Sequence, residues 1–166
     1  MYFYHTRSTP EQAKKLRCHS NLVRLYQAIL IYSHNYQGNK YPPPDNWCDA
    51  LIMADTHSGD SSLFVCPSAK PSNYLERCHY AINPNVRPNA PQDIVLLFET
   101  TEGWNQSGGP ELLNFDNHLG KGCYVLFNNG SVEFITPDQI DQLKWKDDSK
   151  KSSPVPPTMP PPPPLD

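Results

Sequence analysis

The stretch that decides the fold is STPEQAKKLRCHSNLVRLYQAILIYSHNYQGN, residues 8–39. It begins with the signals of a helix start, because Thr9 suits the N-cap, Pro10 needs no backbone N–H at the first helical position, and Gln12 can complete a capping box. Gly38 suits the end of the helix, and the prolines at 42–44 prevent its resumption. Residues that repeat at helical spacing fill the interval: Leu16, Leu22, Leu25, Tyr26, Ile29, Leu30, Ser33 and Tyr36. The stretch predicts one long amphipathic helix with a single buried face.

Strand signals come much later in the chain. Residues 94–98 and 123–127 form apolar runs that are typical of buried strands, and residues 132–135 form a third short run. Asn128, Asn129 and Gly130 lie between the last two runs and tolerate the positive φ of a tight hairpin turn. Thr136 and Pro137 then repeat the helix-start pattern, which predicts a short helix through about residue 143 or 145.

The segment between helix and strands is irregular. Residues 45–91 show a possible helical turn at 46–54 and a short apolar piece at 63–66, and we interpret the remainder as loop. The fold class that follows is α+β, with a long N-terminal helix packed on a small antiparallel sheet and loop-rich insertions.

Composition divides the 166 residues into three parts. Residues 1–7 are expected to be a truncated or disordered N-terminus, and residues 8–146 a folded domain. Residues 147–166 lack apolar periodicity and are rich in proline, which predicts a disordered or polyproline II tail. We interpret this tail as a spacer rather than as a ligand for an aromatic groove.

Charge and hydropathy exclude two classes of partner. The net charge is −3 and the sequence pI is about 6.0, so the chain lacks the excess of positive charge that binding to a nucleic-acid backbone requires. No run of about 18 apolar residues is present that could cross a bilayer.

Five motifs occur in an order that resembles one bacterial family. They are Cys18-His19-Ser20-Asn21-Leu22, Asn39-Lys40-Tyr41-Pro42-Pro43, Phe64-Val65-Cys66-Pro67-Ser68, Val95-Leu96-Leu97-Phe98-Glu99, and the span from His118 to Asn129-Gly130. In this order they resemble the type IV pilin-like proteins with a prepilin-type processing-associated domain, whose signature is a His, nine residues and Asp-Gly. This chain departs from the signature, because ten residues separate His118 from Asn129 and Asn replaces Asp. Asn keeps the turn-forming property but lacks the charge that a cation site would use.

The resemblance implies a pilin-like fold and a structural role. It implies a pseudopilin or minor pilin subunit of a bacterial envelope, pilus or secretion assembly, located on the periplasmic or extracellular face and without enzymatic activity. Its partners would be other pilin-like subunits or envelope proteins, and it would reach the membrane only through a hydrophobic helix expected before residue 8. Met1 is then an artificial start or the start of a variant that lost its anchor. The alternative is a soluble extracellular ligand-binding or adhesion module on the same scaffold. The motif residues carried over are Cys18, Asn21, Leu22, Cys66, Pro67, His118, Asn129 and Gly130.

Five cysteines are many for a domain of this size and favour disulfides in an oxidising compartment. The candidate bridges are Cys18 with Cys66 or Cys66 with Cys78. Cys123 is expected to be a free thiol because its strand position is expected to be buried.

Metal binding and catalysis are not expected. Cys18-His19 and Cys78-His79 each place a thiol beside an imidazole, but neighbouring helical residues point about 100° apart and no zinc spacing is present. A weaker possibility is calcium, held by carboxylates chosen from Asp55, Asp60, Glu99, Glu102 and Asp116. Nucleophile pairings such as Cys66 with His79, or His118 with Asp116, lack any surrounding motif. His118 is instead expected to pack or hydrogen-bond and so to hold the loop that leads into the next strand.

Overall fold

The long helix predicted from the sequence is α1, which spans Pro10–Tyr36 in the computed structural model. The structure describes residues 9–36, 38–56, 59–74 and 76–148. Both capping-box hydrogen bonds are present: the Thr9 N–H donates to Gln12 Oε1 at 2.8 Å, and the Gln12 N–H donates to Thr9 Oγ1 at 3.2 Å. Gly38 follows the helix with a φ of +56°. The local signals of helix start and end are therefore confirmed.

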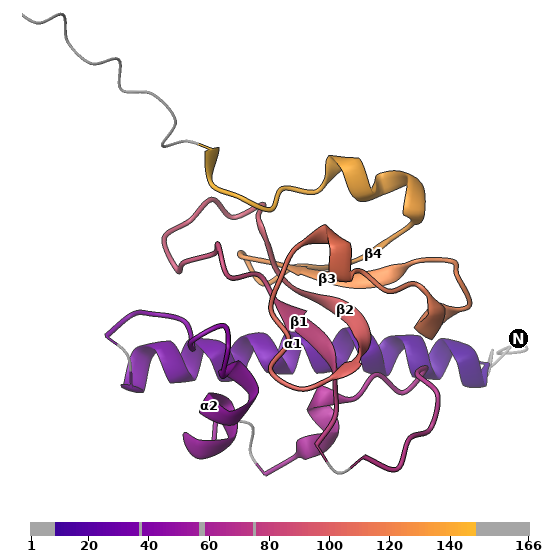
Figure 1. Cartoon of the computed structure of the whole chain (residues 1–166), viewed down its shortest axis with the longest axis horizontal. Coiled ribbons are helices and arrows are strands. Elements are labelled where there is room, and N and C mark those ends of the chain that lie inside the picture. The colour runs from indigo at the N-terminus through magenta and orange to yellow at the C-terminus, as the bar shows by residue number, and fades with distance from the viewer. Residues whose placement is uncertain (1–8, 37, 57–58, 75, 149–166) are drawn as a thin grey trace, which may run out of the picture.

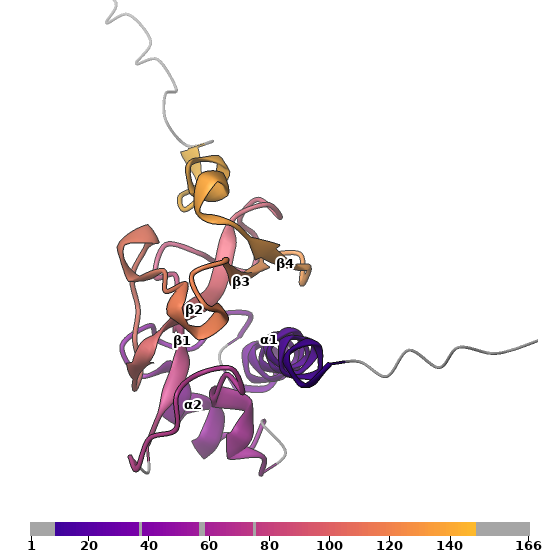
Figure 2. The same cartoon turned by 90° about the vertical axis from the view of Figure 1, so that its right-hand side faces the viewer.

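One face of α1 is buried, and the sheet, α2 and the loops around them lie on that side of the helix (Figures 1 and 2). No other element of the described residues lies on the opposite side of the helix, as the view along its axis shows (Figure 2). Leu16, Leu30 and Tyr36, which the spacing pattern counted among the buried residues, are exposed. The buried residues are Cys18, Asn21, Leu22, Leu25, Ala28, Ile29, Tyr32 and Ser33.

Four strands form one antiparallel sheet in the order β1-β2-β3-β4. Their bounds are β1 Cys78–Ile82, β2 Val95–Gly103, β3 Cys123–Phe127 and β4 Val132–Ile135. The hairpin of β3 and β4 is confirmed, with Cys123 opposite Ile135 and Leu126 opposite Val132. The α+β class with one long N-terminal helix is therefore established.

Strand β1 corrects the interpretation of residues 45–91 as mostly loop. All five of its residues are buried, so the strand has no exposed face and its sequence lacks the alternation of apolar and polar residues that marks a half-exposed strand. One core lies on the side of α1 and includes Leu22, Leu25 and Tyr80. A second core covers the other side of the sheet. In this core Trp145 packs edge-on against Phe98, with ring centroids 5.0 Å apart.

Short helices complete the connections. Helix α2, Trp47–Met53, confirms the predicted helical turn, and the 3₁₀ helix η1, Ser61–Phe64, replaces the short apolar piece. The 3₁₀ helices η2, Pro110–Leu112, and η3, Asp116–His118, lie between β2 and β3. The 3₁₀ helix η4, Pro137–Gln142, confirms the helix predicted after Thr136.

The expected N-terminal part, residues 1–7, and nearly all of the proline-rich tail lie outside the described residues. Within the described part, none of the helices combines the length and the apolar character needed to cross a bilayer.

Candidate functional site

Four side chains with metal-binding or catalytic chemistry meet beneath α1. Cys18 comes from the buried face of α1, Cys66 from the loop after η1, Glu99 from β2 and His118 from the end of η3. None of the four residues is more than 1% exposed. One potential ligand atom from each lies within 4.8 Å of the others, so the four form a group that could hold a metal ion.

His118 Nε2 lies at the centre of the contacts within the group. It is 3.1 Å from Glu99 Oε1 and 3.0 Å from Oε2, and 3.9 Å from the sulfur of Cys66. The Tyr124 backbone N–H donates to Glu99 Oε2 at 2.7 Å, which fixes the carboxylate from the side of β3. The site is therefore a compact arrangement of two sulfurs, an imidazole and a carboxylate.

Hydrogen bonding inside the group shifts the pKa values of the two thiols in opposite directions. The hydrogen bond from Cys66 outweighs the effect of burial and lowers the pKa of Cys18 to about 6. The same hydrogen bond, together with burial, raises the pKa of Cys66. Burial lowers the pKa of His118, but its hydrogen bonds to Cys18 and Glu99 outweigh burial and bring that pKa to about 9. At neutral pH the group thus favours a Cys18 thiolate beside a His118 imidazolium.

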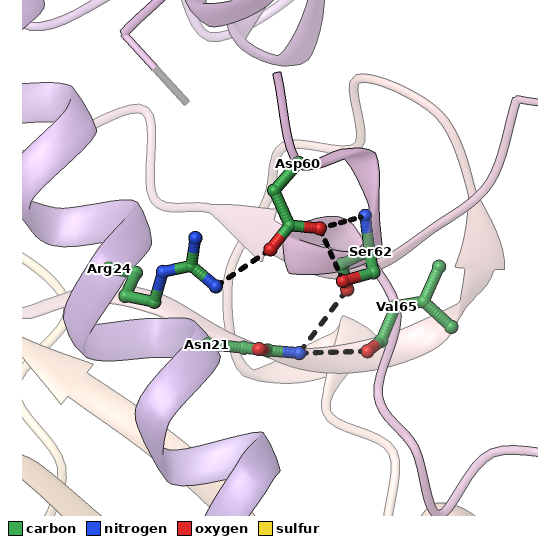
Figure 3. A network of polar contacts seen from close by, with 5 residues as sticks. All are labelled: Asn21, Arg24, Asp60, Ser62 and Val65. Carbon is green, nitrogen blue, oxygen red and sulfur yellow. Dashed lines mark hydrogen bonds and ion pairs between the residues drawn. The ribbon is translucent and has the colours of Figure 1, made fainter. Parts of the chain in front are cut away.

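The loop that carries Cys66 is held to α1 by polar contacts (Figure 3). Asn21 Nδ2 donates to the Val65 carbonyl at 2.9 Å and to the Ser62 carbonyl at 3.4 Å. One turn further along, Arg24 forms an ion pair with Asp60 at 2.8 Å. The motif residue Asn21 therefore positions the backbone that precedes Cys66.

The remaining residues of these two motifs support the same junction. Leu22 is fully buried in the core beside the loop. Pro67 follows Cys66 in a turn that the Ala69 N–H closes by donating to the Cys66 carbonyl at 3.0 Å. Both are structural residues without a ligand atom in the cluster.

Aromatic rings hold His118 from the other side. Tyr124 and Phe134 each contact its ring in a T-shaped geometry, with centroids at 5.4 and 5.5 Å. The His118 backbone N–H donates to the Phe115 carbonyl at 3.1 Å, and Leu119 then turns the chain with a φ of 58°. The packing role expected for His118 agrees with these contacts, and the carboxylate beside it is Glu99 rather than the exposed Asp116.

The five cysteines carry free thiols and fall into three groups. Cys18 lies beside Cys66, so a bridge between them stays a prediction. Cys78 donates a hydrogen bond from its sulfur to the Tyr80 carbonyl at 3.3 Å, and Cys48, a neighbour that the sequence did not indicate, adds to burial in raising the pKa of Cys78. Cys123 is buried in the second core, as expected.

The calcium candidates do not gather in the described part of the chain. Glu99 pairs with His118, and Asp60 forms an ion pair with Arg24. Glu102 accepts a hydrogen bond from Ser72 at 2.7 Å. These carboxylates serve separate contacts, and the one group of metal-ligand type found among the described residues is the cysteine-histidine-glutamate cluster.

The two residues of each adjacent Cys-His pair do not bind together at one site. His19 packs against Tyr124 with ring centroids at 6.1 Å, while Cys18 joins the cluster. His79 is buried, and its Nδ1 has no hydrogen-bond partner. The sequence pattern does not reveal the group of Cys18, Cys66, Glu99 and His118, because its members come from four segments that no local spacing links.

The hairpin turn is a second structural centre. Asn129 is exposed, and its side chain accepts hydrogen bonds from the Ser131 N–H and hydroxyl at 2.9 and 2.7 Å. Gly130 has a φ of +86°, and a Cβ there would lie 2.5 Å from the Tyr26 ring. Asn128, which the sequence predicted only as a turn residue, is buried, and its side chain contacts two other segments.

Comparison with known proteins gives no family for this chain. No family model, curated protein or solved structure matches it.

Proposed function

We propose that the chain is a pilin-like structural subunit that assembles through the outward face of α1, in the manner of a pseudopilin or minor pilin. The observation that carries this proposal is the set of aliphatic residues on the side of α1 that faces away from the sheet. The order of the five motifs supports the same assignment.

The outward residues have the spacing of a helix-pairing surface. Leu16 and Leu30 are 66% and 42% exposed and lie two heptads apart, so they point in nearly the same direction. The half-buried Val23 lies midway between them on the same side, and Ile31, 46% exposed, widens the stripe. The buried residue Leu25 lies on the opposite side, against the sheet.

An exposed aliphatic stripe of this kind is suited to a second helix. α1 has 27 residues and is therefore about 40 Å long, which gives a neighbouring helix several turns to pack against. In the proposed assembly the helices of neighbouring subunits pack along this stripe, and the sheet faces away from the helical core. Attachment to the envelope would require a hydrophobic segment before α1.

Site-specific photocrosslinking in the native bacterium tests this proposal. Benzoylphenylalanine is placed at Leu30, and at Tyr74 as the control, because Tyr74 is 76% exposed and is not part of α1. We expect the probe at Leu30 to crosslink the N-terminal helix of another pilin-like subunit or of a second copy of the chain, identified by mass spectrometry. Tyr74 should not give this product.

A double substitution supplies the second arm. Leu16→Lys with Leu30→Lys adds charge to exposed positions, so the free energy of unfolding should change by no more than about 1 kcal/mol. The crosslink from a probe at Ile31 should nevertheless disappear. If the chain is present in the envelope and probes at Leu30 and Ile31 never reach another N-terminal helix, the proposal is wrong.

A further inference from the structure

We propose that Cys18, Cys66, Glu99 and His118 bind one Zn²⁺ ion, which joins α1 to the sheet. This inference is independent of the assembly proposed above, because it rests on the interior of the domain and not on the outward face of α1. It also reverses the sequence-based expectation that the chain holds no metal.

The donor set is one that zinc prefers. Two thiolates, an imidazole and a carboxylate provide four protein ligands, the number found in closed structural zinc sites. Sulfur ligands favour zinc over calcium and magnesium, which take oxygen. A site with four protein ligands and no exposed member leaves no position for substrate, so the ion would be structural.

The distances agree with a tetrahedral site. With zinc–sulfur distances of about 2.3 Å and zinc–nitrogen or zinc–oxygen distances of about 2.0–2.1 Å, neighbouring ligand atoms lie about 3.3–3.8 Å apart. The measured separations are 3.0 and 3.1 Å between His118 and Glu99 and 3.9 Å between Cys66 and His118, and none in the group exceeds 4.8 Å. Shifts of less than about 1 Å per ligand would suffice, which side-chain rotation supplies.

Two backbone groups around the cluster fit a metal site. The Tyr124 N–H donates to Glu99 Oε2 at 2.7 Å, and the Ser68 backbone lowers the pKa of Cys18. Such outer contacts orient ligands and stabilise their anionic forms. Zinc binding would release the Cys66 thiol proton and one proton of the His118 imidazolium to solvent, and the +2 charge would offset two of the three negative ligand charges.

A disulfide between Cys18 and Cys66 would use only two of the four groups. It would leave the Glu99 carboxylate, which is fully buried, with His118 and one backbone N–H as its partners. In that state the charge of Glu99 is balanced by the His118 imidazolium, and neither sulfur contributes to the balance. A zinc ion gives all four side chains a role, and for this reason we favour the metal over the bridge.

The test uses the full chain, purified with a reducing agent, loaded with Zn²⁺ and passed over a weak chelating resin. We expect one zinc per chain by mass spectrometric metal analysis, and a fall in the midpoint of thermal unfolding after treatment with a strong chelator. Glu99→Gln preserves the shape of the side chain and should weaken zinc binding by about 100-fold or more, because it removes an anionic ligand. Cys18→Ser should abolish retention, whereas Cys123→Ser removes a buried thiol outside the group and should retain one zinc.

Cobalt substitution provides a readout that does not depend on the variants folding. Co²⁺ bound at this site should give the visible bands of tetrahedral cobalt and a thiolate-to-cobalt charge-transfer band. The proposal is overturned if the folded, reduced wild type retains no zinc, if Co²⁺ binds without the thiolate band, or if Cys18→Ser and Glu99→Gln both retain one zinc. Recovery of Cys18 and Cys66 as a disulfide from freshly isolated protein, with no zinc uptake after reduction, would assign the pair to a bridge instead.

Discussion

Asn128 offers the sharpest test of how the hairpin is attached to the rest of the domain. Its Oδ1 accepts a hydrogen bond from the Tyr41 hydroxyl at 2.8 Å, and its Nδ2 donates to the carbonyls of Ala90 and Arg87 at 3.0 and 3.3 Å. The side chain thus joins β3 to two loops from distant parts of the sequence. Asn128→Ala removes all three contacts and leaves their partners with no replacement from the protein.

The expected loss follows from these contacts. A net contribution of about 0.5–1.5 kcal/mol per hydrogen bond, over three bonds at a buried position, gives a loss of about 2–4 kcal/mol in the free energy of unfolding. With a urea m-value of about 2 kcal/mol/M, the unfolding midpoint should fall by about 1–2 M with the m-value unchanged.

The neighbouring residue is a matched control. Asn129 is also an asparagine of the turn, but it is exposed and its side chain contacts only Ser131 among the described residues, while its backbone N–H donates to the Gln92 carbonyl, a bond that an alanine keeps. Asn129→Ala should cost less than about 1 kcal/mol. Equal losses for the two variants, or a loss below about 0.5 kcal/mol for Asn128→Ala, would refute the reasoning.

Three further predictions concern single side chains. Gly130→Ala should lower the free energy of unfolding by about 1–3 kcal/mol in urea titrations, because the new Cβ meets the Tyr26 ring at a positive φ; an unchanged midpoint would contradict this. Asn21→Leu keeps the size of the side chain but leaves the Val65 carbonyl without its donor, so we expect a loss of about 1–3 kcal/mol by the same method. Burial lowers the pKa of His79 below its usual 6.5, so the folded state should lose stability as the pH falls below about 6.5, where the unfolded chain takes up the proton first. His79→Leu should flatten this part of the pH profile of unfolding midpoints, and a profile identical to that of the wild type would show that His79 does not contribute.

The elements with local signals were predictable from the sequence. The bounds of α1 follow from Thr9, Gln12 and Gly38, each of which acts within a few residues of its own position. The β3–β4 hairpin follows in the same way from a turn of asparagines and a glycine between two apolar runs. In both cases the residues that decide the structure are neighbours in the chain.

The elements stabilised only by distant contacts were not predictable. Strand β1 is buried on both sides, by the core under α1 and by the core around Phe98, so its sequence shows neither alternation nor a purely aliphatic run. The cysteine-histidine-glutamate cluster is a stronger example. Its closest members in sequence, Glu99 and His118, are separated by 19 positions, and only the docking of α1 on the sheet brings Cys18 to them. The adjacent Cys-His pairs are visible in the sequence because their residues are neighbours, but in the fold Cys18 joins the cluster and His19 packs against Tyr124.

The Cys18, Asn21 and Leu22 motif now has a physical explanation that does not involve assembly. The three residues occupy one turn of α1 on its buried face, where the first reaches Cys66, the second holds the carbonyls before it and the third fills the core. Their spacing of three and four positions is required for one helical face to dock one loop. The contacts of this motif explain how a loop is attached to a long helix. Likeness in this motif therefore bears on the fold, and a shared fold need not imply a shared function. Evidence for the proposed assembly has to come from the other side of the same helix, where Leu16 and Leu30 are exposed and lie outside the core.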